Sequence, residues 1–535
     1  MTSADQAAAK ADRAPVASLG PSLSAQAGHA VRWSTATTLG RLLVQLGAQV
    51  LLARLIGPAD YGVYALGLAL LTFANFIAGS GFSHSLVLRP SVTPDLVRLA
   101  FSWQVAAGAT CALALALAAP AFAALFRAPD LVPTLRWMAL ACLLSAGAGT
   151  ALCLLQRALD FRRLGLLQLA AYGVGYLGVG LPLALAGWQA QALAVACVVQ
   201  AAATLVLSLW VQPHALRPLW RDPGSGRAGH DLRSEVLATG RRVFVTNLVN
   251  WVAANLDRLV VGRWLPAQAV GWYALAWNLA QIPTSLLVGA AQPALLASGT
   301  RVAGDPQRLA RAWLPALAGC VVLLPPVAVT MALLASDLVG LLYGPAWAGT
   351  GPVLALMLLG LPAWTAWALA TPVLWHTGQP WREATLQLPL LALAVVAWLM
   401  LAPRGALAVA GVSLALTHAR AACTVAASLH RLGLRVVPLA GLLVRGGVLA
   451  AACGIAGWAA LGGLPAGEPA ATGPAWHAWR LAVGALGSAT CGVLLVLACP
   501  ALIGPEAQDL LRRVLPPGLV RRLRVDWLRA PGAQA

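Results

Sequence analysis

The chain has 535 residues, of which 60% are hydrophobic and only 10% are charged, and its mean hydropathy is +0.77. A soluble domain carries about 25% charged residues, so this composition excludes a soluble globular protein and predicts a polytopic α-helical membrane protein. The net charge of +19 would favour a nucleic-acid partner in a soluble domain, but here the arginines gather in alternate loops, so we expect no nucleic acid.

Apolar runs that could each cross a hydrocarbon core of roughly 30 Å follow one another along the chain, and we predict about fourteen membrane spans. Before them, residues 1–31 lack the apolar core of a signal peptide and are predicted to be a disordered cytoplasmic tail. An N-terminal six-helix lobe over 32–211 holds spans at about 32–53, 61–87, 99–126, 132–155, 164–186 and 189–211. A C-terminal six-helix lobe over 241–430 holds spans at about 241–264, 269–298, 311–336, 351–375, 384–402 and 405–429. An additional helix pair in 431–504, at about 438–464 and 478–503, precedes a basic cytoplasmic tail at 505–535.

The distribution of arginine predicts the orientation of these spans. The polar linker 212–240 and the other even-numbered connections hold most of the loop arginines, such as Arg157, Arg163, Arg217, Arg227 and Arg308. The odd-numbered connections hold few, chiefly Arg54, Arg127, Arg263 and Arg404. Because cytoplasmic loops carry the excess of cations, we expect the linker and both termini to lie in the cytoplasm.

A short motif occurs twice. The segments ARLIGPADYGVYAL at 53–66 and GRWLPAQAVGWYAL at 262–275 align without a gap at an offset of 209, which pairs Arg54 with Arg263 and Gly62 with Gly271. Six spans separate the copies, so the two halves have the same orientation and are parallel repeats. Within the first copy, Gly57-Pro58 should break the helix, Asp60 should cap the next one, and Gly62 should allow a close helix approach.

The repeat also relates two polar helix faces. Span one carries Ser34, Thr38, Arg41, Gln45 and Gln49 at helical spacing, and span seven carries Thr246, Asn247, Asn250, Asp257 and Arg258. Such groups are costly in lipid and usually face a cavity, although they can also bond helices together. We therefore predict a substrate-binding cavity lined by Arg41, Gln45, Gln49, Asn247, Asn250, Asp257 and Arg258, with Asp257 pairing across the lobes with Arg41.

No metal site, disulfide framework or cofactor is expected. The nine cysteines lie almost all within apolar runs, and no two form a CxxC pair. His84 and His418 are candidate titrating groups, but a single histidine in a helix is more often a packed hydrogen-bonding residue.

Four segments together resemble one transporter family: LLARLIGPADYGVYAL, LLQRALDFRRLG, NLDRLVVGRWLPAQAVGWYALAWNLAQIP and LLYGPAWAGTGPVLALMLLG. They are similar to the Wzx-type flippases of polysaccharide biosynthesis, which belong to the multidrug/oligosaccharidyl-lipid/polysaccharide exporter superfamily. The resemblance covers roughly residues 32–380. It implies two six-helix lobes around a central cavity, with spans one and seven lining it, in a bacterial inner membrane.

The implied activity is transfer of an undecaprenyl-diphosphate-linked glycan, for surface polysaccharide synthesis, from the cytoplasmic to the periplasmic leaflet by alternating access. Its expected partners are that glycan, membrane lipid and a possible coupling ion, either proton or sodium. Arginine suits the diphosphate because its planar fork binds phosphate oxygens in pairs.

Two other functions remain open. A multidrug extruder of the same fold would favour buried carboxylates for cationic drugs, whereas Asp257 is the clearest acidic residue inside a span. A membrane glycan polymerase or ligase would need catalytic acids on an external platform. The chain has only 17 acidic residues, and its longest external stretch, about 465–477, offers little beyond Glu468 and His477, so we expect no enzyme.

Overall fold

The computed structural model describes residues 40–79, 92–158, 160–220, 248–301, 306–376, 380–434, 437–462, 473–505 and 507–508. Over these residues the chain is helical with short connections and contains no strand. The predicted tail at 1–31, residues 221–240 of the predicted linker and nearly all of the tail at 505–535 lie outside the described residues.

The N-terminal half contains helix 40–56, α3 (Pro58–Gly79), α5 (Pro94–Phe126), α6 (Leu131–Arg157), α7 (Phe161–Tyr172), the π-helix η1 (Gly173–Gly180), α8 (Leu181–Leu185) and α9 (Gln189–Val211). The C-terminal half contains helix 248–264, α11 (Ala267–Arg301), α12 (Pro306–Leu333), α13 (Ala335–Tyr343), η2 (Pro345–Trp347), α14 (Thr350–Leu359), α15 (Leu361–His376), α16 (Pro380–Leu401), η3 (Ala402–Arg404) and α17 (Ala406–Arg431). The last elements are α18 (Val437–Gly462), α19 (Pro474–Ala498) and η4 (Pro500–Leu502).

Each of the predicted spans falls on one of these helices or on a helix that is broken. Among the described residues, ten helices are long and apolar enough to cross a membrane, and α14 with α15 forms one further span bent by 42°. The break lies at Gly360, between the two helices. Helix α13, which occupies the connection after α12, was not predicted. The all-α polytopic fold is confirmed.

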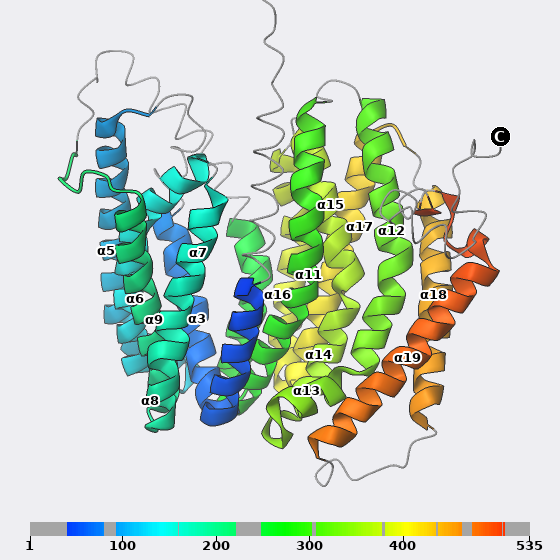
Figure 1. Ribbon diagram of the computed structural model, residues 1–535, viewed down its shortest axis with the longest axis horizontal. Coiled ribbons are helices and arrows are strands. Elements are labelled where there is room, and N and C mark those ends of the chain that lie inside the picture. The colour runs from blue at the N-terminus through cyan, green and yellow to red at the C-terminus, as the bar shows by residue number, and fades with distance from the viewer. Residues whose placement is uncertain are drawn as a thin grey trace, which may run out of the picture.

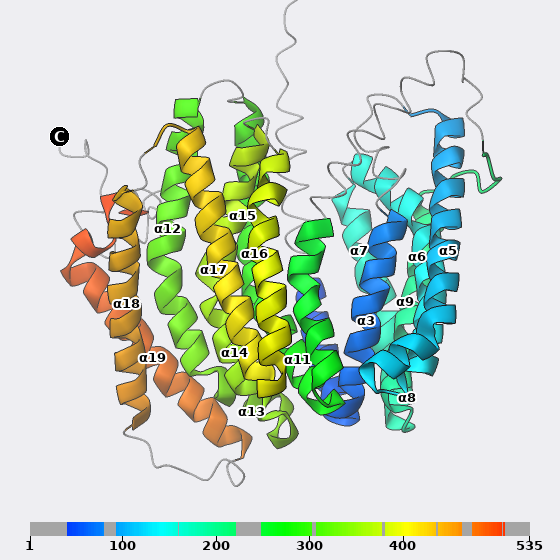
Figure 2. The ribbon, with the colours of Figure 1, turned by 180° about the vertical axis from the view of Figure 1, so that it is seen from behind.

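The helices form two lobes side by side (Figure 1). Helices α3 to α9 lie on one side and α11 to α17 on the other, and the view from behind shows the same division (Figure 2). The additional pair packs on the outer side of the second lobe, where α18 contacts α12 and α19 contacts α13. The domain boundaries given above stay a prediction.

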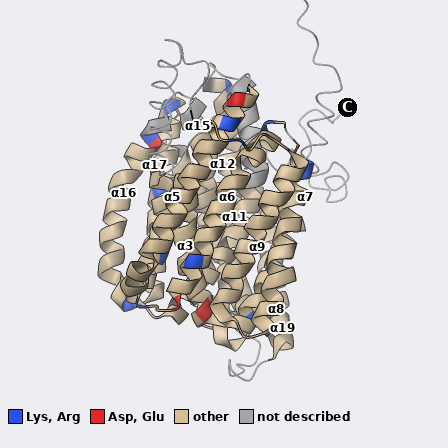
Figure 3. Ribbon diagram, turned by 90° about the vertical axis from the view of Figure 1, so that its left-hand side faces the viewer, with Lys and Arg blue, Asp and Glu red and all other residues tan. Residues whose placement is uncertain are grey.

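The outer surface has the character of a surface that faces lipid. Large apolar side chains such as Leu117, Met400 and Trp458 are about 70% exposed. Charged residues gather toward the two ends of the helices, and the stretch between is nearly uncharged (Figure 3). Exposure of so much apolar surface to water would be unfavourable, whereas lipid accommodates it, so the protein is a multi-pass membrane protein.

The two lobes meet where α3 and α11 begin, an end that we call the junction end. Gly57 adopts a φ of 83°, which ends helix 40–56 and lets α3 start at Pro58. A methyl group on Gly62 would overlap the carbonyl oxygen of Ala267, and one on Gly271 would overlap the carbonyl oxygen of Pro58. Ala267 is the counterpart of Pro58 at the offset of 209 residues, just as Gly271 is the counterpart of Gly62. The two contacts are therefore equivalent under the repeat. The close approach predicted for Gly62 is confirmed, and its partner is the other copy of the motif.

Span five changes helix type along its length. Residues 173–180, with the sequence GVGYLGVG, form a π-helix between α7 and α8. A methyl group on Gly175 would overlap the backbone of Ala196 in α9, and one on Gly180 would meet the Ala196 side chain. Glycines therefore let the π-helix and α9 pack backbone to backbone, as small residues do in membrane helix pairs.

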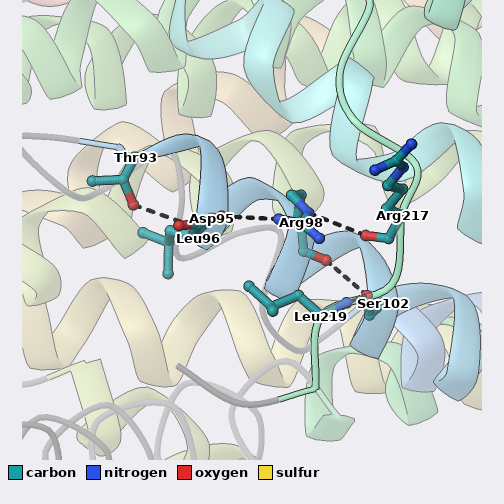
Figure 4. A network of polar contacts seen from close by, with 7 residues as sticks. All are labelled: Thr93, Asp95, Leu96, Arg98, Ser102, Arg217 and Leu219. Carbon is teal, nitrogen blue, oxygen red and sulfur yellow. Dashed lines mark hydrogen bonds and ion pairs between the residues drawn. The ribbon is translucent and has the colours of Figure 1, made fainter. Parts of the chain in front are cut away.

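The start of the predicted linker packs along α5 (Figure 4). The Leu219 backbone N–H donates to the Ser102 hydroxyl at 2.8 Å, and Arg98 donates to the Arg217 carbonyl at 3.3 Å. Arg98 also pairs with Asp95 in the first turn of α5 at 3.1 Å. Residues 212–220 are thus held against the N-terminal lobe.

An ion pair with the buried carboxylate of Asp337 fixes the N-terminal part of α19, the second helix of the additional pair. Arg480 of α19 donates through Nε to both carboxylate oxygens of Asp337 in α13 at 3.1 Å, and His477 Nδ1 lies 3.0 Å from the same carboxylate. The Asp337 side chain is only 10% exposed. This contact joins α19 to the C-terminal lobe at the junction end.

Candidate functional site

Arg41, Gln45 and Gln49 of the polar face of span one lie on helix 40–56, which faces both its own lobe and the junction, and Ser34 and Thr38 lie outside the described residues. Arg41 is exposed, and its Nη1 donates to Gln168 of α7 at 2.6 Å. Gln45 is half-buried. Gln49 donates through Nε2 to the Tyr61 hydroxyl at 3.2 Å. The polar face therefore bonds within its lobe and leaves the cation of Arg41 accessible.

The predicted residues of span seven lie on helix 248–264, except Asn247, which lies outside the described residues. Arg258 donates to the side-chain oxygen of Asn255 at 2.5 Å and to the Ala254 carbonyl at 3.3 Å. Its guanidinium lies over the Trp277 ring, 3.9 Å from the centroid, which is cation–π geometry. Its Nε is buried and has no hydrogen-bond partner. One donor of this cation thus remains available.

Asp257 is buried and receives several hydrogen bonds. Its Oδ2 accepts from the hydroxyls of Tyr273 at 2.7 Å and Ser413 at 3.2 Å, and its Oδ1 accepts from the Arg258 backbone N–H at 2.8 Å. The predicted pairing of Asp257 with Arg41 across the lobes is therefore wrong for this conformation. The carboxylate is satisfied by hydroxyls of its own lobe, while Arg41 bonds to Gln168 of the other.

A pocket opens beside Asp257 inside the C-terminal lobe. Helix 248–264, α11, α14, α15 and α17 contribute its walls, and its polar lining comprises Asp257, Gln281, Thr284, Ser413 and Thr417. Trp277 and Trp364 supply aromatic faces. Its volume of about 50 Å³ accommodates a few water molecules or an ion, whereas pockets for larger ligands measure roughly 300–1,000 Å³.

Tyr61 of α3 connects the predicted face of span one with α11 of the other lobe. Its hydroxyl accepts from Gln49 of its own lobe at 3.2 Å and from Asn278 of the other lobe at 3.0 Å. Arg258 is near enough to act on Tyr61 electrostatically. The sequence repeat singled out helix 40–56 but missed Tyr61, through which that helix is joined to α11 of the other lobe, although Tyr61 lies inside the repeated motif.

A second polar cluster in the C-terminal lobe was also missed. Arg420 of α17 is buried and donates to Gln387 and to Asn250, each at 3.0 Å. Its guanidinium also lies 4.7 Å from the centroid of the Trp367 ring. Glu383, which is fully buried, interacts with Arg420 electrostatically. The predicted site residue Asn250 is thus occupied in supporting this cation. The available signal was an arginine in the middle of span twelve.

No group of three or more His, Cys, Asp or Glu side chains that could hold a metal ion occurs in the described part of the chain. The polar groups that converge between the lobes are arginine, asparagine, glutamine and tyrosine. This set can bind anionic and hydroxyl-rich ligands, since arginine supplies charge-assisted donors and the amides supply both donors and acceptors.

Comparison with known proteins is consistent with this geometry. The family model described as polysaccharide biosynthesis protein matches residues 51–352, more than half of the chain. The succinoglycan biosynthesis transport protein ExoT of Rhizobium meliloti (strain 1021) is 26% identical over 330 residues, which cover 61% of this chain and 64% of ExoT. The lipopolysaccharide biosynthesis protein WzxC of Escherichia coli (strain K12) is 22% identical over 326 residues, which cover 61% of this chain and 65% of WzxC. The chain thus spans a little under two thirds of each relative.

Among solved structures, the lipid II flippase MurJ in an inward closed conformation has a TM-score of 0.65. The similarity covers 87% of this chain and 99% of MurJ at 13% sequence identity, so it establishes the fold alone. Because the family model matches more than half of the sequence, this chain belongs to the polysaccharide biosynthesis protein family.

Proposed function

We propose that this protein moves an undecaprenyl-diphosphate-linked glycan from the cytoplasmic to the periplasmic leaflet of a bacterial inner membrane, for the synthesis of a surface polysaccharide. Family membership and the names of the relatives, which refer to transport and to polysaccharide biosynthesis, support this proposal. In this orientation the junction end faces the periplasm, and both termini and the linker 212–240 face the cytoplasm, as the arginine distribution predicts.

The observation that carries the proposal is the cationic character of the two equivalent helices. Arg41 is exposed on helix 40–56, and Arg258 on helix 248–264 keeps a buried Nε without a partner. An arginine inside a membrane costs roughly 2.5–3.5 kcal/mol on insertion scales, and an anionic ligand offsets that cost. Both therefore suit a diphosphate, while Gln45, Gln49 and the span-seven amide Asn247 suit sugar hydroxyls, and Asn250 supports Arg420 instead.

Alternating access requires the lobes to separate at each end in turn. Tyr61 lies at the point where this separation would begin, because its two hydrogen bonds come from different lobes. Breaking the bond from Asn278 leaves the bond from Gln49 in place, so the hydroxyl keeps a partner in both states. Little free energy is then needed to part the lobes there, since a net hydrogen bond contributes about 0.5–1.5 kcal/mol.

The coupling ion, proton or sodium, is assigned in this proposal to Asp257. Its carboxylate borders a pocket with room for an ion, and the hydroxyls of Ser413 and Thr417 supply further oxygens. Asp257→Asn keeps the shape and removes the charge, so we expect the protein to fold and transport to fall at least tenfold. Transport that still follows the ion gradient in Asp257→Asn would exclude this assignment.

The function is tested in a strain that lacks the gene. Lipid-linked glycan should accumulate on the cytoplasmic leaflet, and the native chain should restore export. Arg41→Ala and Arg258→Ala should fail to restore it although each protein is present in the membrane. The lysine variants should restore part of it, because the charge remains while the planar fork is lost. Arg311→Ala, which changes an exposed cation of α12, serves as the matched control.

Two outcomes would count against the proposal. One is normal surface polysaccharide in the deletion strain when no second exporter of this family is present. The other is full export by both Arg41→Ala and Arg258→Ala. Topology is tested separately with Arg227→Cys in a cysteine-free chain, where labelling from the periplasmic side would contradict the proposed orientation.

One observation favours a second candidate, a multidrug extruder. The pocket places the carboxylate of Asp257 beside Trp277 and Trp364, a combination that attracts organic cations, and it would have to widen from about 50 Å³ to admit one. Increased drug susceptibility of the deletion strain, with unchanged surface polysaccharide, would favour this function over glycan export. A polymerase or ligase is less well supported, because the described polar groups converge within the helical bundle and not on an external platform.

A further inference from the structure

The turn that follows α13 has no role in the function proposed so far. Its sequence, YGPAW at 343–347, belongs to a segment that the sequence analysis singled out. Gly344 has a φ of 84°, which reverses the chain after α13, and η2 then ends at Trp347. The side chains of Tyr343 and Trp347 are 3% and 1% exposed. We call residues 343–347 the plug.

The plug of the C-terminal lobe packs against the N-terminal lobe. The Trp347 ring meets the Tyr61 ring edge to face, with centroids 5.4 Å apart, and Tyr343 lies beside Trp347 at 5.9 Å. The Tyr343 hydroxyl is buried and has no hydrogen-bond partner. Two aromatic rings thus fill the boundary between the lobes at the junction end, beside the tyrosine that is hydrogen-bonded to both lobes.

Both lobes hold the plug in place: the N-terminal lobe bonds to the end of α13 just before it, and the C-terminal lobe bonds to the plug's own backbone. From the N-terminal lobe, Arg54 donates through Nε to the Leu342 carbonyl at 2.6 Å and through Nη2 to the Leu341 carbonyl at 2.7 Å. These carbonyls lie in the last turn of α13, where they have no helical partner and form the negative end of the helix dipole. From the C-terminal lobe, Trp272 donates to the Ala346 carbonyl at 3.1 Å.

The repeat explains why the contact forms on one side. Arg263 is the counterpart of Arg54. In the N-terminal half, residues 127–130 join α5 directly to α6, and no helix equivalent to α13 lies between them. Nη1 of Arg263 is indeed buried without a hydrogen-bond partner. Of these two equivalent arginines, only Arg54 faces free helix-end carbonyls.

We propose that the plug is the periplasmic gate of the transport path and that Arg54 is the residue that positions it. The orientation and the transport path rest on the proposed function. The gate is closed while Arg54 holds the last turn of α13, and it opens when the lobes separate at the junction end. Because Arg54 is exposed, water can replace both carbonyls as its hydrogen-bond partners. The contact between Arg54 and the end of α13, which we call the latch, is therefore reversible.

The first test measures access past the plug and needs no knowledge of the cargo. Gln49→Cys is introduced into a chain whose nine native cysteines are replaced, and an impermeant maleimide is added from the periplasmic side. Position 49 lies roughly 7.5 Å farther along the helix from the junction end than Arg54. Addition of Arg54→Ala should increase the labelling rate at least fivefold, and Arg54→Lys should give an intermediate rate.

Arg404→Ala is the matched control, since Arg404 is an exposed cation in η3 at the same end of the molecule. It should leave the labelling rate at position 49 unchanged. Thermal unfolding shows whether each variant is folded. Equal labelling of folded Arg54→Ala and its parent would overturn the proposal.

The second test locks the gate. Arg54→Cys and Leu342→Cys are joined by a short bis-methanethiosulfonate linker, which a reductant removes. Export should stop with the linker in place and return after reduction, while either single-cysteine variant should be unaffected by the reagent. Export that continues in the bridged protein would overturn the gate. If the protein exports no glycan at all, the proposed function fails, and the labelling experiment still decides whether Arg54 closes this end.

Discussion

The contact between the two copies of the repeated motif makes a quantitative prediction for Gly62→Ala. The added methyl group would overlap the carbonyl oxygen of Ala267 and approach the backbone nitrogen of Gly271. Both obstacles are backbone atoms and cannot rotate away, so α3 and α11 must separate by about 1 Å, the scale of strain at which an overpacked interior shifts its backbone. Gly271→Ala should have the same effect through Pro58.

Overpacking of this kind costs about 1–3 kcal/mol. If the cost falls on the state in which the lobes touch, the equilibrium shifts toward separation at the junction end by about 5- to 150-fold, since 1.4 kcal/mol corresponds to a factor of ten. The double variant should cost less than the sum of the two, because one separation of the helices relieves both overlaps.

Two measurements check this prediction. Thermal unfolding of the purified protein reports the loss of stability, and labelling of Gln49→Cys from the periplasmic side reports separation of the lobes. Gly411→Ala is the matched control, because a methyl group there would meet no atom within 4 Å and should stabilise α17 slightly. Equal unfolding temperatures for Gly62→Ala and Gly411→Ala, or additive effects in the double variant, would contradict the argument.

Three further predictions concern the described packing of the lobes. Arg420→Met removes a buried cation with two charge-assisted hydrogen bonds and should lower the free energy of unfolding by about 3–5 kcal/mol, measured by thermal or chemical unfolding in detergent. Asp337→Asn should release the N-terminal end of α19 and raise the rate of backbone hydrogen exchange there. Asp95→Asn also breaks an ion pair, but the Asp95 side chain is 52% exposed, so the free energy of unfolding should change by less than about 1 kcal/mol. Gly175→Ala should cost about 1–3 kcal/mol in the same unfolding assay because it meets the α9 backbone, while Gly178→Ala, which makes only an ordinary contact at 3.7 Å, should be nearly neutral.

Much of the fold could be predicted because membrane burial leaves a strong signal in the sequence. An apolar run of about twenty residues has few alternatives to a spanning helix, so each of the predicted spans falls on a helix. The repeated motif carried more information still, since it gave the relation of the lobes and, in Gly62, a residue that makes the contact. The π-helix in span five and α13 gave no such signal, because both are apolar and differ from their surroundings only in backbone geometry.

The site was predictable only where the polar groups repeat. Helix 40–56 and α11 meet at Tyr61, yet the partners of individual side chains depended on packing that no spacing reveals. Asp257 illustrates the point, because Tyr273 and Ser413 satisfy it from positions 16 and 156 residues away.

Two arginines outside the predicted site, Arg420 and Arg54, show why polarity alone does not identify a binding residue. Arg420 is the more deeply buried, and it is surrounded by an amide from each of two helices, an aromatic face and a nearby carboxylate. Two of its donors are engaged by these amides and its face is covered by Trp367, so its role is to support the lobe. Arg54 is exposed and is held only by backbone carbonyls at a helix end, which water can replace. The same side chain therefore serves as a fixed support where its partners surround it and as a reversible latch where its partners lie on the opposite lobe. The difference follows from how deeply each arginine is buried and from which lobe its hydrogen-bond partners belong to. It separates residues that stabilise a single lobe from residues whose contacts must break when the lobes move.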